Sequence, residues 1–285
     1  MKPVLSKLLL NFLAAQKNDK LRFILLKKLF EKNGKKLNDF KSFFNDRFFI
    51  YKVNNNALPT QKLNWACDYE NFEAKIDSIA LIKYQVRPGD IIIDIGAGVG
   101  EEVVVLANRV GPTGKVYAIE ANPQVAQILS EVVKLNQFQN VEVHNLAIYK
   151  NDMEIYLEDE LDSYIGGTLN EQNNQVKNYA VLGTRIDSFF KTHKITKVSL
   201  LKSNIEGAER FVVDTMSEEN LDIIENIVIS CHDFKYLRTG NEFYQTKKYI
   251  INFLTSKGFE ITTQKTGKDY IDDYIYGVNR RIKQS

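Results

Sequence analysis

The sequence predicts an α/β fold with a mostly parallel seven-stranded sheet whose last strand is antiparallel, preceded by an N-terminal helical extension. Short apolar runs of strand length alternate with segments of helical periodicity from about residue 71 onward. The last two apolar runs, at 259–263 and 270–279, are joined by a turn at 265–268. Because this turn is too short for a crossover, the two strands must form an antiparallel hairpin.

The expected elements follow one another in a regular order. A helix is expected to start within 77–81, before the turn Arg87-Pro88-Gly89-Asp90. The strands of the sheet are expected at 91–95, 115–119, 141–147, 198–204, 224–231, 259–263 and 270–279. Helices follow the first two strands, and another is expected over 242–256. Short strands at 153–157 and 179–182 bracket Gly166-Gly167-Thr168 in an insertion.

The most informative stretch is the apolar strand that ends at Asp94 and Ile95 and continues into Gly96, Ala97, Gly98 and Gly100. Alternating glycines let a backbone turn tightly and approach a ligand where any Cβ would clash. The spacing G-x-G-x-G differs from the G-x-G-x-x-G of dinucleotide-binding domains, which place pyrophosphate on a helix N-terminus. The stretch therefore predicts a nucleotide-type cofactor of another class.

Acidic side chains around this glycine loop narrow the choice of cofactor. Asp94 precedes the loop, and Glu101 and Glu102 follow it in the first helical turn. Carboxylates repel pyrophosphate but suit a ligand that carries a cationic sulfonium and an ammonium group. S-adenosylmethionine, with S-adenosylhomocysteine as its product, is such a ligand. We therefore expect all three carboxylates to lie in its binding site.

The second strand ends at a further acidic residue. Glu120 lies about 20 residues beyond the last glycine, the spacing expected of a carboxylate that binds ribose hydroxyls. Asn122 is expected to cap the helix that Pro123 begins, because proline has the fixed φ favoured at a first helical position. Ala121 beside this cap, and Ala147 at the end of the third strand, are also expected to bind the cofactor.

Composition indicates one main domain and no covalent or metal-bound framework. The chain has 285 residues, 44% of them hydrophobic, which suffices for a sizeable core. Its two cysteines, Cys67 and Cys231, lie far apart without metal-ligand spacing, so we expect neither a disulfide nor a zinc site. No apolar stretch is long enough to span a bilayer, and no secretion signal is evident, so a cytoplasmic location is expected.

The N-terminus is strongly basic, although the whole chain carries a net charge of only +2. Residues 1–41 hold eleven Lys or Arg against three acids, a net charge of +8. Two amphipathic helices joined near Asn18-Asp19 are predicted by apolar residues at helical spacing, namely Leu5, Leu8, Leu9, Phe12, Leu21, Ile24, Leu25 and Leu29. We expect their apolar faces to pack on the main domain or on a second subunit in a homodimer. Peripheral docking on an anionic membrane is an alternative, and nucleic-acid binding is the least favoured.

An aromatic-rich segment links these helices to the cofactor domain. It contains Phe40, Phe43, Phe44, Phe48, Phe49, Tyr51 and Trp65. Packing is the favoured role of these rings, with contact to a cyclic substrate as the alternative. The predicted organisation is an N-terminal helical and aromatic extension over 1–70 and a cofactor-binding domain over 71–285.

Three motifs give the chain a resemblance to a known family. They are Arg87-Pro88-Gly89-Asp90 leading to Asp94-Ile95-Gly96-Ala97, then 184–190 with the sequence TRIDSFF, then 201–209 with the sequence LKSNIEGAE. Together they resemble FkbM-type methyltransferases over roughly residues 70–278. The resemblance implies the class I, Rossmann-like methyltransferase fold and O-methylation, often of a sugar or natural-product hydroxyl. Asn204 departs from the family, which usually has an aspartate there.

Candidate catalytic residues lie at the carboxyl ends of the fourth and fifth strands, beside the expected cofactor crevice. Asn204 and Glu206 follow the fourth strand, and His232 and Asp233 follow the fifth. We predict His232 as the general base, because an unperturbed histidine titrates near pH 6.5. Glu206 and Asn204 are then expected to orient the acceptor, and Asn204 also to bind the cofactor.

We expect no metal ion in this site. Glu206, His232 and Asp233 offer hard ligands, but Asn204 replaces a potential carboxylate and the loop after the fourth strand holds no close pair of aspartates. His144 and His193 lie outside the expected crevice.

The leading hypothesis is an S-adenosylmethionine-dependent O-methyltransferase acting on a hydroxyl of a saccharide or sugar-bearing metabolite. The alternatives are RNA or protein methylation and a non-catalytic scaffold of the same fold. No nucleic-acid partner is expected, because the N-terminal apolar spacing resembles packed helices more than a phosphate-binding surface.

Overall fold

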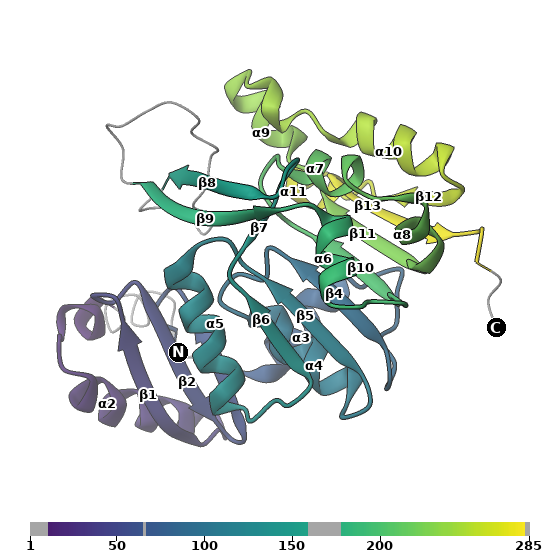
Figure 1. The fold of residues 1–285 in the computed structure, drawn as a ribbon. Helices are drawn as coiled ribbons and strands as arrows, with labels where there is room; N and C mark the ends of the chain where they lie inside the picture. The colour runs from purple at the N-terminus through teal and green to yellow at the C-terminus, as the bar shows by residue number, and fades with distance from the viewer. Residues whose placement is uncertain (1–10, 65–66, 159–177, 283–285) are drawn as a thin grey trace.

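A seven-stranded sheet forms the centre of the molecule in the computed structural model, which describes residues 11–64, 67–158 and 178–282 (Figure 1). Its order is β12-β13-β11-β10-β4-β5-β6. The strands are β4 (Ile91–Ile95), β5 (Lys115–Ile119), β6 (Val141–His144), β10 (Leu200–Ser203), β11 (Asn226–Ser230), β12 (Phe259–Thr263) and β13 (Tyr274–Asn279). Only β13 is antiparallel to its neighbours in this sheet. The predicted sheet and its antiparallel C-terminal pair are confirmed, with two corrections to the bounds of the strands. The third strand ends at His144, because Ala147 belongs to a strand of another sheet, and the start of the last predicted strand forms the short helix α11 (Asp269–Asp272).

Helices cover both faces of this sheet, so its central strands are buried on both sides. Ile92 belongs to one core with α3 (Tyr69–Ser78), α4 (Glu101–Val110) and α5 (Pro123–Leu135). The next residue, Ile93, belongs to a second core on the other face. The helices of that face include α6 (Ile186–Thr192), α7 (Glu209–Asp214), α8 (Glu218–Ile223) and α10 (Lys247–Ser256). Burial on both faces explains the continuous apolar run of β4.

A second, smaller sheet carries the insertion. Its order is β7-β9-β8, with β7 at Ala147–Ile148, β8 at Met153–Glu158 and β9 at Asn178–Thr184. The two short strands predicted on either side of the insertion are therefore present. Gly166-Gly167-Thr168 lies outside the described residues.

Two helix boundaries differ from the sequence prediction. The helix before β4 was expected to start within 77–81, but α3 ends at Ser78. Its start is fixed by Asp68, whose side chain accepts a 2.7 Å hydrogen bond from the Asn71 N–H. The helix expected over 242–256 is divided into the 3₁₀ turn η1 (Glu242–Tyr244) and α10. Asp233 causes this division, because its Oδ2 accepts hydrogen bonds from the amides of Thr246 and Lys247 and fixes the start of α10.

The N-terminal extension contains a sheet that the sequence did not predict. After α2 (Asp19–Lys32), the strands β1 (Leu37–Phe43), β2 (Phe48–Val53) and β3 (Asn56–Thr60) form an antiparallel sheet in that order. Four of its aromatic rings are buried, namely Phe40, Phe48, Phe49 and Tyr51. The favoured packing role of these aromatics is confirmed, whereas Trp65 lies outside the described residues.

The buried face of α2 is shifted from the predicted one. Residues Arg22, Leu26 and Phe30 face inward, whereas Leu21 and Ile24 are 39% and 52% exposed. The prediction placed Phe12, Leu21 and Ile24 on the packed face and is wrong for all three, since Phe12 is also 52% exposed. Apolar spacing alone cannot identify the buried Arg22 on which the packed face is centred. Of the other predicted positions, Leu5, Leu8 and Leu9 lie outside the described residues.

Arg22 is buried because it connects three segments of the extension. Its guanidinium binds both carboxylate oxygens of Asp46 in the β1–β2 turn, at 2.5 and 2.8 Å. It also donates to the carbonyls of Leu13 and Ala14 and to the carboxylate of Asp19. The Arg22 guanidinium holds the pKa of Asp46 well below its usual range.

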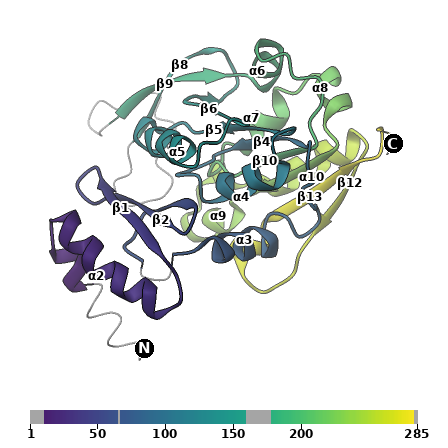
Figure 2. The same ribbon diagram turned by 90° about the horizontal axis from the view of Figure 1, so that it is seen from below.

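The extension packs on the part of the chain that holds the large sheet, through β3 and α5. The side chain of Asn136 accepts from the Ala57 N–H at 2.8 Å and donates to the Ala57 carbonyl at 2.9 Å. Arg47 donates to Gln124 of α5 at 3.0 Å. One continuous core joins the extension to α3, α4 and α5, and the views in Figures 1 and 2 place it beside α5.

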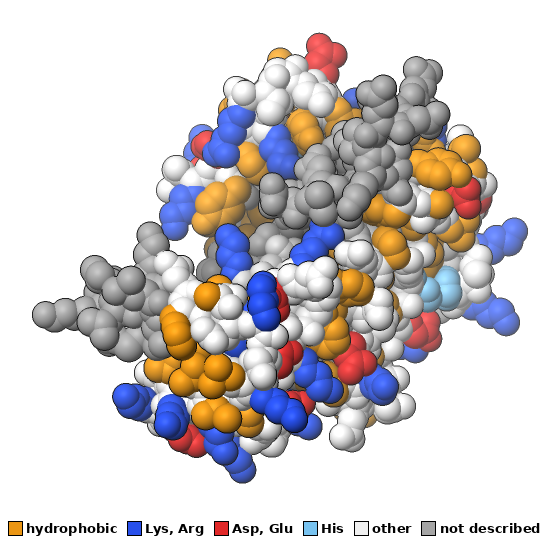
Figure 3. Space-filling model, turned by 90° about the vertical axis from the view of Figure 1, so that its left-hand side faces the viewer, with side chains coloured by type: hydrophobic (Ala, Val, Ile, Leu, Met, Phe, Trp, Pro, Cys, Tyr) orange, Lys and Arg blue, Asp and Glu red, His pale blue; other side chains and the backbone are white. Residues whose placement is uncertain are grey.

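The outer surface of the extension remains basic. Figure 3 shows Lys and Arg side chains around hydrophobic ones over the lower part of that face. Among the described residues, no helix has the length and apolar character needed to cross a membrane.

We expect Asp46→Asn to destabilise the protein by about 3 kcal/mol, because it leaves the buried Arg22 charge without its bidentate partner. This destabilisation lies at the lower end of the range expected when one partner of a buried ion pair is removed, because Asp19 still binds Arg22. Urea unfolding measures this change. Glu260→Gln is the control, because its pair with Arg280 is exposed and should contribute at most about 1 kcal/mol. Equal effects of the two substitutions would contradict a structural role for Arg22.

Candidate functional site

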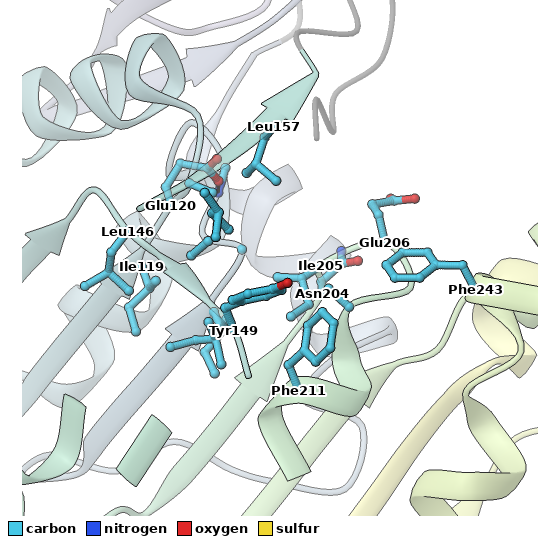
Figure 4. Close-up of a pocket in the computed structure, with 18 of the residues that line it drawn as sticks. Ile119, Glu120, Leu146, Tyr149, Leu157, Asn204, Ile205, Glu206, Phe211 and Phe243 are labelled. Atoms are coloured by element: carbon cyan, nitrogen blue, oxygen red, sulfur yellow. Dashed lines mark hydrogen bonds between the residues drawn. The ribbon is translucent and has the colours of Figure 1, made fainter. Parts of the chain in front are cut away.

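A cavity of about 450 Å³ opens at the carboxyl ends of β4, β5 and β10. This is the edge at which ligands bind in parallel α/β sheets. The predicted site residues that line it are Gly96, Gly98, Glu120, Ala121, Ala147, Asn204 and Glu206 (Figure 4). Apolar walls are added by Ile119 and Leu146. The cofactor half and the acceptor half of the predicted site therefore share one cavity.

Each of the three glycines in the loop after β4 is required for a different physical reason. All three have positive φ, from 56° at Gly98 to 97° at Gly100. A Cβ on Gly96 would lie 2.1 Å from the carbonyl oxygen of Asn204, so β10 and the loop approach as closely as a backbone can. A Cβ on Gly100 would lie 2.7 Å from Leu129. A Cβ on Gly98 would meet no protein atom within 4 Å. Gly98 thus leaves room on the cavity side for a ligand.

Glu120 holds the glycine loop and faces the cavity. Its Oε2 accepts from the Gly98 N–H at 2.9 Å, and its Oε1 accepts from the Asn122 N–H at 2.8 Å. Burial raises the pKa of this carboxyl to about 7, although the two backbone N–H groups oppose the shift. Each carboxylate oxygen can accept a second hydrogen bond, as binding of a ribose diol requires.

The other three predicted carboxylates are neutralised by lysines. The ammonium of Lys202 lies 2.8 Å from Asp94 Oδ1 and 2.7 Å from Glu102 Oε2. Lys75 binds Glu101 at 2.7 Å. None of the three acids lines the cavity, so the expectation that they attract a cationic ligand directly is corrected. The sequence analysis missed Lys202 because nothing in its spacing reveals which acid it meets.

Ala97 and Asn122 support the cofactor loops from behind. The Ala97 N–H donates to the carbonyl of Ile119, and the Asn122 side chain caps α5 by accepting from Gln124 and Val125. The predicted cap is confirmed. Both residues shape the cavity without lining it.

Glu206 brings a carboxylate to the acceptor half of the cavity (Figure 4). Its backbone has φ 57°, a left-handed conformation that costs a non-glycine residue of order 1 kcal/mol or more. His232 Nε2 lies 3.2 Å from its Oε1, and Lys235 binds its Oε2. Burial opposes ionisation of Glu206, but His232 and Lys235 together lower its pKa below the ordinary value. Glu206 is therefore an ionised acceptor at neutral pH.

The buried carboxylate of Glu209 fixes the loop that carries Glu206. It is fully buried and accepts from the Gly207 N–H at 3.0 and 3.1 Å and from the Ile205 N–H at 3.3 Å. It also binds His232 Nδ1 at 2.8 Å. Glu209 belongs to the motif over 201–209, but the role of Glu209 follows only from these contacts, which the sequence does not reveal.

His232 does not meet the conditions for the predicted general base. Both ring nitrogens lie within hydrogen-bonding distance of glutamates, Glu206 and Glu209. Although burial disfavours the charged ring, these two carboxylates raise the pKa of His232 to about 9. The ring is thus a cation at neutral pH and cannot accept a proton. The prediction assumed the unperturbed pKa near 6.5, and this assumption fails because two acids flank the ring.

Aromatic side chains form the remaining wall of the acceptor half. Tyr149, Phe211 and Phe243 line the cavity around Asn204 and Glu206 (Figure 4). Phe243 comes from η1 and packs against the backbone of Gly207. A Cβ on Gly207 would lie only 2.7 Å from the Phe243 ring. The sequence does not reveal these rings as neighbours, because they come from three separate segments of the chain.

Glu206, His232 and Asp233, the three residues considered as metal ligands, make other contacts in the structure. Asp233 caps α10, and Glu206 and His232 bind each other. Within the described ranges, the three residues do not form a group of convergent metal ligands.

Comparison with known proteins identifies the family of the chain. The Methyltransferase FkbM domain model matches residues 94–261, more than half of the chain. "Methyltransferase 1" of Beauveria bassiana is 23% identical over 242 residues, covering 77% of this chain and 89% of the relative. A probable cobalt-precorrin-6B C(15)-methyltransferase of Sulfolobus acidocaldarius is 36% identical over 97 residues, 33% of this chain and 48% of that protein.

Two solved structures illustrate the similarity in three dimensions. Aeropyrum pernix fibrillarin with natively bound S-adenosyl-L-methionine has 13% identity and a TM-score of 0.44, covering 81% of this chain and 94% of that one. A putative O-methyltransferase from Klebsiella pneumoniae has 12% identity and a TM-score of 0.44, covering 95% and 96%. With the matched domain extending from the glycine loop to β12, the chain belongs to the FkbM methyltransferase family.

Proposed function

We propose that this methyltransferase transfers a methyl group from S-adenosylmethionine to a hydroxyl of a saccharide or sugar-bearing metabolite. The observation that carries the proposal is the ionised carboxylate of Glu206, held in the acceptor half of the cavity by His232 and Lys235. A carboxylate beside the Asn204 amide offers the acceptor groups that bind a hydroxyl. The rings of Phe211 and Phe243 offer flat apolar faces of the kind on which sugars stack.

The cofactor half of the cavity fits S-adenosylmethionine, the donor used by the FkbM family. Glu120 would bind the ribose hydroxyls, and the apolar side chains of Ile119 and Leu146 suit a base. Gly98 leaves space where any side chain would intrude.

The residues of the chain then have simple tasks. S-adenosylmethionine supplies an activated methyl group when bound. Glu206 and Asn204 orient the acceptor hydroxyl, and Glu206 accepts its proton as the new bond forms. His232 and Lys235 hold the Glu206 carboxylate in its strained position. The aromatic wall excludes water from the reacting atoms.

Transfer of label from S-adenosylmethionine to a host extract tests the acceptor class. The proposal expects label in the saccharide or sugar-bearing small-molecule fraction. Label in RNA or protein would replace the proposed acceptor by one of the alternative substrates. Retained S-adenosylhomocysteine binding without transfer to any fraction would favour the non-catalytic scaffold.

Glu120→Ala should weaken S-adenosylmethionine binding by about 1.5–3 kcal/mol, because hydrogen bonds to a charged acceptor are lost. The pKa of about 7 adds a pH dependence. The carboxylate is ionised above this value, so affinity should fall as the pH drops from 8 to 6 in the wild type and stay flat in the variant. Calorimetry measures both effects, with Glu131→Ala on α5 as the control. An unchanged dissociation constant for Glu120→Ala would remove Glu120 from the site.

Glu206→Gln should lower kcat by about 10²–10⁴-fold at saturating S-adenosylmethionine, because the amide cannot accept the hydroxyl proton. Donor affinity should remain unchanged. Since the pKa of Glu206 is lowered, wild-type kcat should be constant between pH 6 and 8. It should decline as the pH rises through about 9, where His232 loses its proton and releases Glu206.

His232→Asn separates positioning from proton transfer. This variant should lose less kcat than Glu206→Gln and should lack the decline near pH 9. Glu242→Gln, an exposed acid on η1, is the matched control and should keep full activity. A wild-type rate that falls with decreasing pH through 6.5 would restore histidine as the base.

A further inference from the structure

Two histidines and a glutamate converge at the edge of the large sheet, away from the cavity described above. Glu142 and His144 are two residues apart on the edge strand β6 and so share one of its faces. His193 is the C-cap residue of α6, which packs against that face. One ligand atom from each of the three side chains lies within 4.8 Å of the others.

The distances between these atoms suit a small divalent ion. His144 Nε2 lies 3.5 Å and His193 Nδ1 lies 4.0 Å from the same Oε2 of Glu142. Tetrahedral zinc holds N and O ligands at about 2.0–2.1 Å, so neighbouring ligand atoms lie about 3.3 Å apart. The side chains of His193 and Glu142 are partly exposed and can close the remaining gaps, which are about 0.7 Å between His193 Nδ1 and Glu142 Oε2 and at most about 1.5 Å for any pair of ligand atoms.

Neighbouring residues orient Glu142 and His144 so that their ligand atoms are available to a metal ion. His144 Nε2 is buried and has no hydrogen-bond partner in the described part of the chain. Lys115 binds the other oxygen of Glu142, Oε1, at 2.5 Å and leaves Oε2 directed at the rings. Phe189 and Tyr117 pack against His144 and fix its plane.

We propose that Glu142, His144 and His193 form a binding site for a divalent transition-metal ion, with zinc as the expected occupant. Imidazole nitrogens with one carboxylate oxygen are a donor set that zinc accepts, and a water molecule completes the tetrahedron. The ion joins β6 to the end of α6. It also adjoins the cofactor site, because the backbone carbonyl of His144 accepts from the Glu120 N–H at 3.0 Å.

Zinc titration of the full-length, chelator-treated protein tests the site by calorimetry. We expect one equivalent to bind with a dissociation constant of roughly micromolar or below. His144→Gln and His193→Gln should each weaken binding at least about tenfold, because each removes a ligand. His232→Gln, at the third histidine of the chain, is the control and should bind zinc like the wild type.

Thermal unfolding supplies the second readout. Zinc should raise the melting temperature of the wild type and of His232→Gln, but not that of His193→Gln. If His144→Gln does not fold, His193→Gln at the partly exposed end of α6 decides alone. Absence of binding at millimolar zinc, or equal affinity in His193→Gln and the wild type, would overturn the proposal and leave the cluster as aromatic packing.

Discussion

The buried ammonium of Lys202 is the interaction on which the site depends. It lies in the central strand β10 and binds Asp94 at the end of β4 and Glu102 at the start of α4. These two acids lie on either side of the glycine loop, so one side chain fixes both ends of that loop. Burying such an ion alone costs several kcal/mol, and the two carboxylates offset this cost. The loop conformation and the position of β10 are therefore determined together.

Glu209 acts on the acceptor side as Lys202 acts on the cofactor side. Glu209 follows Lys202 by seven residues in the chain. Its carboxylate binds two backbone amides of the loop 205–207 and the His232 ring. The same segment thus contributes a buried cation beside the glycine loop and a buried anion beside the loop 205–207. This arrangement gives a physical reason for the presence of Lys202 and Glu209 in the motif over 201–209. It also allows Glu206 to keep a left-handed backbone, since the amides on both sides of it are held.

Local patterns in the sequence predicted those features that depend on local chemistry. The mostly parallel sheet with its antiparallel last strand, the tight turn of the glycine loop and the Asn122 cap follow from periodicity and backbone sterics, and the structure shows all three. Glu120 was identified by its spacing from the loop, which a short strand-loop-helix unit fixes. Asn204 and Glu206 were found because parallel strands end at one edge.

Pairing between distant charges could not be predicted in the same way. Asp94 and Lys202 are 108 residues apart, and Arg22 and Asp46 are 24 apart. Periodicity does not reveal such partners, so the acids of the loop were expected to bind a ligand and nothing in the sequence identified Arg22 as buried. The same reason explains the wrong pKa of His232, whose two neighbours come from another strand's loop. The sheet of the extension was missed because its aromatic spacing fits a compact core of any kind.

The contact between Asn136 and Ala57 has a consequence for association with other chains. Sheets with an exposed edge offer unpaired N–H and C=O groups that recruit foreign strands. On β3 the amide of Asn136 occupies both backbone groups of Ala57, as a neighbouring strand would do. Two residues on, Pro59 faces the same direction and has no N–H to donate. A helix side chain and a proline thus close this edge against strand addition, so the small sheet can stand at the periphery of the molecule without seeding aggregates.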